Sequence, residues 1–340
     1  MTSAMSAEIN NSVAAYDVFN GDADGICALH QLRLAEPLTA ELITGAKRDI
    51  DLLNRFSTKS GDRVTVVDIS LDSNISALRQ HLNAGAKITY FDHHNAAQAF
   101  EHEHLDLHCD LAADVCSSIL VNRYLNGLYW KWAVVAAYGD NLPAVATVMA
   151  GDAGLSQSQR EHLQELGTLL NYNAYGESVD DLHFHPAALY QAVHDYIDPF
   201  DFLHNAAQFT LLRNAYASDM AFMQGLHADR ESELTSIYIL PAQAWARRVS
   251  GILANQLTQE EPGKSFAVLT AKPDGNYVVS IRSGDADRCP AGQFCSAFAT
   301  GGGRRGAGGI NHLQASEVDS FVQAFIAYFE KMEIPQLSLT

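Results

Sequence analysis

Tyr16-Asp17-Val18-Phe19-Asn20-Gly21-Asp22-Ala23-Asp24-Gly25 is the stretch from which the architecture of this 340-residue chain can be inferred. Its first four residues have the apolar and aromatic character of a β-strand, and Asn20 and Gly21 end that pattern as a turn. Apolar residues at helical spacing from Ile26 to Leu34 then indicate a helix. A strand, an acidic turn and a helix in this order are typical of the start of a βαβ unit.

The same arrangement of a strand followed by acidic residues recurs twice. Val64–Val67 is a predicted strand followed by Asp68, and Lys87–Phe91 is a predicted strand followed by Asp92-His93-His94. A further strand at Glu41–Thr44 and helical patterns at Ile50–Phe56 and Ile75–Leu82 complete the alternation. Alternating strands and helices predict an α/β fold with a parallel sheet, and functional residues of such sheets gather at the carboxyl ends of the strands.

Four acidic clusters therefore suggest a metal site: residues 20–25, Asp68, Asp92-His93-His94 and Gly139-Asp140. Carboxylates that converge cannot all stay ionised unless cations neutralise them. Carboxylate and imidazole donors favour Mn²⁺, Mg²⁺ or Zn²⁺, and two such ions about 3.5–4 Å apart can hold the attacking and leaving oxygens of a phosphoryl group. The clusters predict hydrolysis of a phosphate ester or anhydride.

Length, composition and charge set limits on the partners. With 340 residues, of which 47% are hydrophobic, the chain can form cores in two domains. The formal net charge of −18 opposes binding of long duplex nucleic acid, because that affinity comes mostly from Lys and Arg that neutralise phosphates. We expect a short or small phosphorylated substrate instead.

The cysteines and the apolar segments favour a cytoplasmic protein. Five cysteines without a Cys-x-x-Cys pair argue against a disulfide framework and against a zinc ribbon. Residues 1–12 lack the basic and apolar parts of a secretion signal, and no later stretch approaches the roughly 18 apolar residues of a membrane span. We expect no membrane partner.

The rest of the chain is predicted to contain helices and then a second domain. Val115–Leu125, with Asp114 as its N-cap, and Trp130–Tyr138 are predicted helices, and Gly127 separates them. Residues 155–257 are helical by pattern. The later predicted elements are strands at Ser265–Thr270 and Tyr277–Ile281, and helices at Ala291–Ala299 and Val318–Phe329, with the glycine-rich segment 301–309 between the two helices.

These motifs, in this order, resemble those of the DHH phosphoesterase superfamily, which includes exonucleases, oligoribonucleases, cyclic-dinucleotide phosphodiesterases and family II pyrophosphatases. Asp22 and Asp24 match motif I, Asp68 matches motif II, Asp92-His93-His94 matches the name-giving motif, and Asp140 matches motif IV. The last hundred residues resemble the DHH-associated C-terminal domain. The resemblance implies an α/β fold with a parallel-sheet DHH catalytic domain (13–154), a helical linker or insertion (155–260) and a smaller C-terminal α/β domain that binds substrate (261–335).

The resemblance also implies roles for these residues. Asp22 would bind a first metal ion and Asp24 a second, Asp68 would bridge the two, and His93 with Asp140 would complete the second site. Two Mn²⁺ ions, with Mg²⁺ as the alternative, would then activate the hydroxide that attacks phosphorus. His94 would face the substrate phosphate, and Asp92 would orient its neighbours.

Two positions depart from the superfamily pattern. Where relatives place a His or Asp two residues before motif I, this chain has Asn20, whose amide oxygen brings no charge, so we expect weaker binding of the first metal ion. Where relatives have a histidine after the C-terminal glycines, this chain has arginines, with His312 downstream as a substitute. The predicted substrate-binding residues are Arg282, Gly301, Gly302, Gly303, Arg304 and Arg305.

Several alternatives remain open at this point. Residues 20–25 match part of a calcium loop, but position twelve is Gln31 instead of Glu. Asp152 offers the same Gly-Asp dipeptide as Asp140. The glycine run is compatible with a flexible hairpin, and the histidines between His102 and His108 are expected to lie in a solvated surface loop rather than to bind zinc.

The leading hypothesis is a metal-dependent phosphoesterase that hydrolyses phosphodiester bonds of short single-stranded oligonucleotides or small nucleotides, with the substrate in a cleft between the domains. One alternative keeps this site for pyrophosphate, polyphosphate or a phosphomonoester. Another is a nucleotide-binding module with impaired turnover, because the first metal site is incomplete. A homodimer is left open.

Overall fold

The computed structural model describes residues 13–94 and 101–330. Its contacts divide the chain into two compact units, unit 1 with residues 1–174 and 178–212, and unit 2 with residues 175–177 and 213–340. Helix α9, Ala207–Met223, carries the chain from unit 1 into unit 2. The division falls inside the predicted insertion 155–260 and not at either of its ends.

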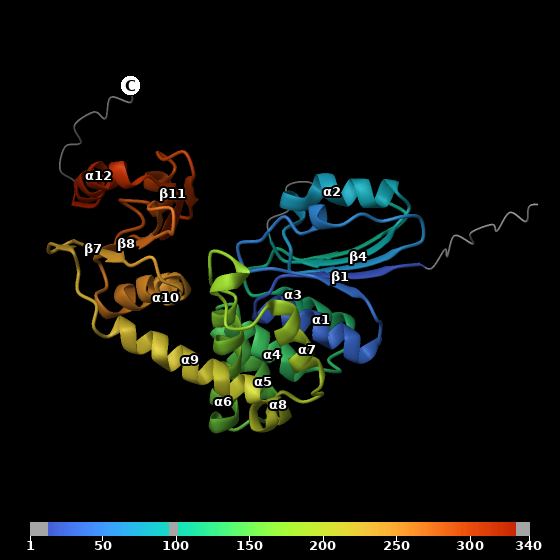
Figure 1. Ribbon diagram of the computed structural model, residues 1–340. Coiled ribbons are helices and arrows are strands. Elements are labelled where there is room, and N and C mark those ends of the chain that lie inside the picture. The colour runs from blue at the N-terminus through green and yellow to red at the C-terminus, as the bar shows by residue number, and fades with distance from the viewer. Residues whose placement is uncertain (1–12, 95–100, 331–340) are drawn as a thin grey trace, which may run out of the picture. The chain divides into compact units, whose positions relative to one another are not determined.

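Unit 1 contains a five-stranded sheet in the described part of the chain, with the order β2-β1-β3-β4-β5 (Figure 1). All neighbouring strands run parallel, which confirms the predicted α/β class. The strands are β1 (Ala15–Phe19), β2 (Glu41–Ile43), β3 (Arg63–Val67), β4 (Lys87–Asp92) and β5 (Leu105–Cys109). Because β1, β3 and β4 are neighbours, the residues that follow them meet at one edge of the sheet.

The helices of unit 1 cover both faces of this sheet (Figure 1). Helix α2 packs on one face through a core that includes Leu78, Leu82 and the strand residues Val66 and Tyr90. Helix α1, in contact with α3 and α4, lies on the other face. The helices are α1 (Ala23–Ala35), α2 (Leu71–Asn83), α3 (Ser117–Tyr124), α4 (Trp130–Gly139), α5 (Pro143–Asp152), α6 (Gln157–Asn173), α7 (Pro186–His194) and α8 (Pro199–Asn205), with 3-10 turns η1 (Leu53–Arg55) and η2 (Val179–Asp181).

Two local predictions in unit 1 are wrong because side chains remote in sequence take the backbone bonds. The segment Ile50–Phe56 forms only the short turn η1, since Asn74 accepts a hydrogen bond from the Leu53 N–H and donates to the Ile50 carbonyl. Helix α3 begins at Ser117 after Cys116, so Asp114 is not its N-cap. The cap comes from Asp24, whose carboxylate accepts from the first N–H groups of α3.

The prediction of a solvated surface loop around His102–His108 is also wrong in part. Leu105–Cys109 forms the edge strand β5, in register with β4. Leu105 and Leu107 pack on the core of the sheet, and the His108 ring stacks on Phe91 at 4.5 Å between centroids. The histidine and acidic residues of this segment hid a period-two pattern of partly buried leucines.

Unit 2 is a mixed sheet in the order β10-β11-β9-β8-β7-β6 over the residues that are described. Its core gathers the aromatic face of α12, Phe321, Phe325 and Phe329, around Phe294 of α11. The elements are β6 (Arg230–Glu231), β7 (Thr235–Leu240), α10 (Ala244–Glu260), β8 (Ser265–Ala271), β9 (Tyr277–Arg282), α11 (Ala291–Cys295), β10 (Gly301–Gly303), β11 (Ala307–Leu313), η3 (Ala315–Glu317) and α12 (Val318–Glu330). The helical pattern predicted for 155–257 is therefore interrupted by β6 and β7, and β7 pairs in parallel with β8.

No helix in the described ranges combines the length and the apolar character that crossing a membrane requires.

Gly139 marks a close approach of three helices next to the acidic edge of the sheet. A Cβ atom at this position would lie 2.4 Å from Ala23 Cβ of α1 and 2.8 Å from the Gly167 carbonyl oxygen of α6. Such contacts require the backbone to shift. The absence of a side chain at Gly139 thus allows α4 to end where Asp140 can reach the sheet edge.

We expect Gly139→Ala to lower the free energy of unfolding by about 1–3 kcal/mol, because the added methyl group meets backbone atoms. Gly151→Ala is the matched control in α5, where the nearest atom is 3.8 Å from the new Cβ, the Nη1 of Arg160. This control should leave stability unchanged or raise it by up to about 1 kcal/mol. Urea denaturation measures both, and equal shifts in the two variants would contradict the packing argument.

Candidate metal centre

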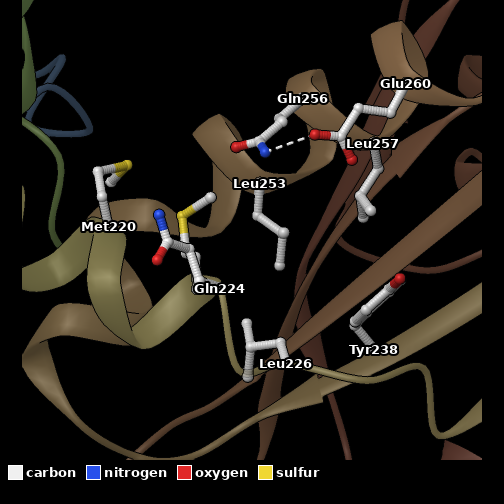
Figure 2. A pocket seen from close by; sticks show the side chains of 9 residues that line it. Met220, Gln224, Leu226, Tyr238, Leu253, Gln256, Leu257 and Glu260 are labelled. Atoms are coloured by element: carbon white, nitrogen blue, oxygen red, sulfur yellow. Dashed lines mark hydrogen bonds between the residues drawn. The ribbon is translucent and has the colours of Figure 1, made fainter.

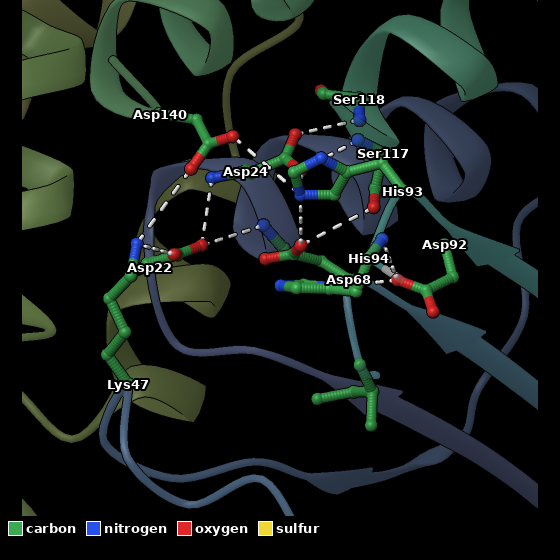
Figure 3. A network of polar contacts seen from close by, with 12 residues as sticks. Asp22, Asp24, Lys47, Asp68, Asp92, His93, His94, Ser117, Ser118 and Asp140 are labelled. Carbon is green, nitrogen blue, oxygen red and sulfur yellow. Dashed lines mark hydrogen bonds and ion pairs between the residues drawn. The ribbon is translucent and has the colours of Figure 1, made fainter. Parts of the chain in front are cut away.

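The carboxyl edge of the unit 1 sheet brings four of the predicted metal-ligating residues together (Figure 3). The Nε2 atom of His93 lies 3.3 Å from Asp68 Oδ1, 3.7 Å from Asp140 Oδ2 and 3.9 Å from Asp24 Oδ2. Donor atoms of Asp24, His93 and Asp140 all lie within 4.8 Å of one another, as do those of Asp68, His93 and His94. Imidazole and carboxylate donors at these separations can surround one divalent cation.

Asp24 lies in the first turn of α1 and is fully buried. Its two carboxylate oxygens accept hydrogen bonds from the backbone N–H groups of Ser117 at 2.8 Å and Ser118 at 2.7 Å. The N-terminus of a helix stabilises an anion through these N–H groups and the helix dipole. Asp24 thereby joins α1 to α3, and its carboxylate also lies beside His93. Ser117 and Ser118 bind Asp24 through their backbone, and the Ser117 hydroxyl also donates to Asp68 Oδ1 at 3.4 Å.

Asp68 follows β3 in the left-handed region, with a φ of 58°, and is almost fully buried. Aspartate is among the residues that tolerate this backbone conformation, and such residues cluster at functional sites. Its backbone N–H donates to the Phe91 carbonyl of β4. Burial and the nearby charges of Asp22, Asp24 and Asp140 raise the pKa of the Asp68 carboxyl well above its ordinary value. A bound cation would favour its ionised form.

Asp92 holds other residues in place. Its Oδ2 accepts from the Leu71 N–H of α2 at 2.9 Å, and its Oδ1 accepts from the backbone N–H of His94 and lies 2.7 Å from His94 Nδ1. Burial opposes protonation of His94, but the hydrogen bond and charge of Asp92 outweigh it and raise the pKa of the imidazole. These contacts orient the partly exposed His94 ring, which lies 4.5 Å from the His93 ring between centroids.

Asp22 is the N-cap of α1, since its Oδ1 accepts from the backbone N–H groups of Asp24 and Gly25. Its Oδ2 accepts from the Lys47 ammonium at 2.6 Å. Burial disfavours the charged form of Asp22, yet the Lys47 charge and the hydrogen bonds from Lys47 and Gly25 hold its pKa below the ordinary value. The oxygen predicted to bind the first metal ion therefore contacts an ammonium group.

Sequence reasoning missed Lys47. The residue follows β2, the neighbour of β1, and its Nζ lies 3.9 Å from Asp140 Oδ1 in addition to its contact with Asp22 (Figure 3). The rule that functional residues follow the carboxyl ends of parallel strands applies to β2 as well, and this position after β2 was the one signal of Lys47 in the sequence.

The structure brings Asp140, and not Asp152, to the cluster. Asp140 is the C-cap residue of α4, and its carboxylate lies beside both His93 and Lys47. Burial, followed by the charges of Asp24 and Asp22, raises the pKa of Asp140 to about 7. Asp152 is exposed at the end of α5 and belongs to neither donor group among the described residues.

Asn20 provides a further test of whether a cation fits. Its Oδ1 is buried and has no hydrogen-bond partner within the described part of the chain. An unpaired buried carbonyl oxygen is costly unless a ligand satisfies it, and amide oxygens are suitable ligands for hard cations. This orphan oxygen is of the type that a hard cation accepts, and Asn20 opens the turn that carries Asp22 and Asp24.

The predicted substrate-binding residues of unit 2 lie in and beside a hairpin. Gly301–Gly303 and residues 307–313 form its antiparallel strands β10 and β11, and Arg282 at the end of β9 lies opposite Ala307. The N–H groups of Ala291 and Gly292 donate to the carbonyls of Arg305 and Arg304, so α11 anchors the tip. The glycine run is thus a hairpin, but one with specific backbone contacts.

The three arginines differ in their surroundings. Arg304 and Arg305 are exposed, and Arg305 pairs with the exposed Asp287 at 2.6 Å. Arg282 donates from Nε to Asn255 Oδ1 at 2.8 Å, and burial lowers its pKa. His312, considered as a substitute for the missing histidine, is exposed on β11.

Unit 2 also contains a pocket of about 420 Å³ between the end of α9, β7 and α10 (Figure 2). Its lining is mostly apolar or amide, with Met220, Leu253 and Tyr238 among the side chains, and Glu260 accepts a hydrogen bond from Gln256. None of the predicted substrate-binding residues lines it. The chemistry suggested by the sequence is therefore concentrated at the sheet edge of unit 1.

The raised pKa of Asp140 predicts how the stability of the metal-free protein depends on pH. The folded chain binds this proton more tightly than the unfolded chain, so stability falls as the pH rises from the ordinary value of 3.8 to about 7. Asp140→Asn removes that ionisation. In EDTA, its free energy of unfolding should therefore fall less than that of the unmodified protein between about pH 5 and about pH 8.

Asp152→Asn is the control for this experiment, since Asp152 is exposed and lies outside both donor groups in the residues described. Its pH dependence should match that of the unmodified protein in urea titrations at both pH values. An Asp140→Asn variant with the same pH dependence as the control would show that Asp140 experiences no repulsion from the cluster.

No protein-family model and no curated protein match the chain. Solved structures do resemble it. Exonuclease RecJ bound to manganese has a TM-score of 0.63 and 14% identity, with 96% of this chain and 92% of that chain covered. A DHH-domain protein described as a member of a family of ribosomal proteins has a TM-score of 0.62 and 14% identity, with 95% and 87% covered.

A third similar structure is the pGpG-specific phosphodiesterase PggH from Vibrio cholerae, with a TM-score of 0.57 and 12% identity, covering 94% of this chain and all of that chain. These similarities extend over both units. They confirm that the chain has the fold of DHH-domain proteins.

Proposed function

We propose that the chain is a divalent-metal-dependent phosphoesterase that hydrolyses phosphodiester bonds of short single-stranded oligonucleotides or small nucleotides. The observation that carries this proposal is the convergence of His93 Nε2 with three carboxylates at 3.3–3.9 Å. Proteins of the same fold support the choice of reaction, since one is named an exonuclease bound to manganese and another a pGpG-specific phosphodiesterase.

We assign the cation to Asp68, His93, Asp24 and Asp140, with Asn20 and Asp22 at the margin of the same site, and Mn²⁺ or Mg²⁺ as the metal. A divalent ion bound there would supply Lewis acidity and lower the pKa of the water that attacks phosphorus. The carboxylates provide the negative charge that retains the ion, and the N–H groups at the start of α3 hold the Asp24 carboxylate in place.

We assign His94 to binding of the substrate phosphate. Asp92 accepts from His94 and favours its protonated form, so the ring can donate a charge-assisted hydrogen bond to a phosphate oxygen. His94 is partly exposed, with a side-chain exposure of 41%, which leaves it accessible to a ligand. Asp92 is fully buried and acts by positioning this ring.

Substrate phosphates are assigned to the hairpin of unit 2. Arg282, Arg304 and Arg305 would provide guanidinium donors, and the backbone N–H groups of Gly301, Gly302 and Gly303 could approach a phosphate closely. A net charge of −18 makes a small number of well-placed cations more suitable for a short substrate than for a long one.

Incubation with Mn²⁺ and end-labelled di- to pentanucleotides tests the reaction. We expect release of mononucleotides, and Asp68→Asn should reduce the rate by more than the roughly 10–100-fold typical of groups behind metal ligands. Asparagine tolerates the positive φ of this position, so the backbone is kept. Asp106→Asn, on the exposed face of β5, is the control and should retain full activity.

Failure to release mononucleotides in the presence of Mn²⁺ would falsify the phosphodiesterase proposal. Release of phosphate from pyrophosphate or polyphosphate under the same conditions would instead favour the alternative substrates for this site.

Arg304→Ala tests substrate binding by the hairpin. The exposed guanidinium is expected to contribute binding rather than chemistry, so KM should rise several-fold while kcat changes little. Arg230→Ala provides the control at the opposite edge of the same sheet, on β6. If both substitutions leave KM unchanged, the arginine hairpin does not bind the substrate.

A further inference from the structure

The acidic cluster has two halves that share Asp140 (Figure 3). In one half, Asp140 Oδ2 and the Asp68 carboxylate lie beside His93 Nε2 at 3.7 and 3.3 Å. In the other half, Asp140 Oδ1 and the Asp22 carboxylate face the Lys47 ammonium at 3.9 and 2.6 Å. One half thus contains an imidazole ligand, and the other contains a protein cation.

Lys47 is held in this position from several sides. Its backbone N–H donates to the Ala174 carbonyl at 3.0 Å, and its ammonium lies 3.3 Å from Asn171 Oδ1. The preceding residue, Ala46, donates its N–H to Asp49 Oδ2 at 3.0 Å. These contacts anchor the segment after β2, so the ammonium is placed by the fold and not only by the length of a flexible side chain.

A metal ion cannot use the same oxygen of Asp22 while Lys47 stays there. An ion such as Mg²⁺ binds carboxylate oxygens at about 2.0–2.1 Å. The ammonium already lies 2.6 Å from Asp22 Oδ2, and its positive charge opposes a second cation next to it. Asn171, which also accepts from the Lys47 ammonium, is an amide and adds no charge that would favour a divalent ion over the ammonium.

We propose that the Lys47 ammonium takes the place of one of two metal ions, so that the cluster binds a single divalent cation in the half formed by Asp68, His93, Asp24 and Asp140. The inference rests on the proposed function in its choice of metal site, and it replaces the expectation of two ions. The protein itself thereby supplies one of the two cations of the cluster, as the Lys47 ammonium, and the metal ion supplies the other. Lys47 is a positioning residue that neutralises Asp22 and the shared Asp140.

The first test counts ions without measuring activity. Calorimetric titration of the metal-free protein with Mn²⁺ should give one ion per chain. Electron paramagnetic resonance of the loaded protein should show the spectrum of isolated Mn²⁺. Two ions per chain bound with similar affinity, with the spectrum of exchange-coupled Mn²⁺, would overturn the proposal.

The second test removes the ammonium. Lys47→Met should raise the count from one Mn²⁺ to two, with an exchange-coupled spectrum, while Lys47→Arg should keep the count at one. Lys131→Met is the matched control, because Lys131 also pairs with an aspartate, Asp198, and has the same side-chain exposure of 32%. Lys131 is the second residue of α4, nine residues before Asp140 and roughly 13 Å away along the helix.

The methionine variant also has a stability readout. Asp22 loses its partner, so the metal-free variant should unfold at a lower temperature than the unmodified protein. Mn²⁺ should raise the unfolding temperature of the variant more than that of the unmodified protein. A single Mn²⁺ bound to Lys47→Met with unchanged affinity would overturn the proposal. If the variant does not fold, the ion count of the unmodified protein and of Lys47→Arg decides.

The outcomes separate the two proposals. Hydrolysis of oligonucleotides by a protein that binds two Mn²⁺ ions would overturn the role of Lys47 and leave the phosphoesterase in place. One bound Mn²⁺ without hydrolysis of any phosphate ester or anhydride would overturn the phosphoesterase and leave the role of Lys47 in place.

Discussion

Repulsion between carboxylates at the carboxyl edge of the unit 1 sheet is the constraint on which the rest of the structure depends. Different groups offset the negative charges of Asp22 and Asp24, and each of these contacts also joins two secondary-structure elements. Asp22 caps α1 and binds Lys47 from the segment after β2, and Asp24 binds the N-terminus of α3. Among the residues that the structure describes, Asp68 has no cationic partner as close as Lys47 is to Asp22, and burial and the neighbouring carboxylates raise its pKa well above the ordinary value. This carboxylate lies 3.3 Å from His93 Nε2, at the point where a cation fits.

Much of this centre could be predicted because its residues follow strands with clear local patterns. The order β1-β3-β4 then brings Asp22, Asp68 and His93 to one edge, as expected for a parallel sheet. Other features depend on bonds between residues remote in sequence. The Asn74 side chain displaces a predicted helix, and Asp24 caps a helix 93 positions later. No local pattern contains such partners.

Lys47 is the residue that changes the interpretation of the site most, and its absence from the predictions has a physical cause. A lysine after a strand usually lies in solvent, so an isolated lysine carries little information. Its role depends on the Asp22 carboxylate 25 positions earlier and on Asn171 far along the chain. In unit 2, the sequence did not reveal strand β7 for a similar reason. A short apolar segment can form a helix or a strand, and here its pairing with β8 makes it a strand.

The fold alone does not establish the reaction, since one fold can support unrelated chemistry. The proposed hydrolysis depends on a cation at the edge of the unit 1 sheet, and anomalous diffraction from a crystal soaked in Mn²⁺ tests this most directly. We predict one strong peak within about 2.0–2.3 Å of Asp68 and His93 donor atoms, and none beside Asp22 Oδ2. A peak elsewhere in the chain, or no peak at this edge, would contradict the proposed metal centre.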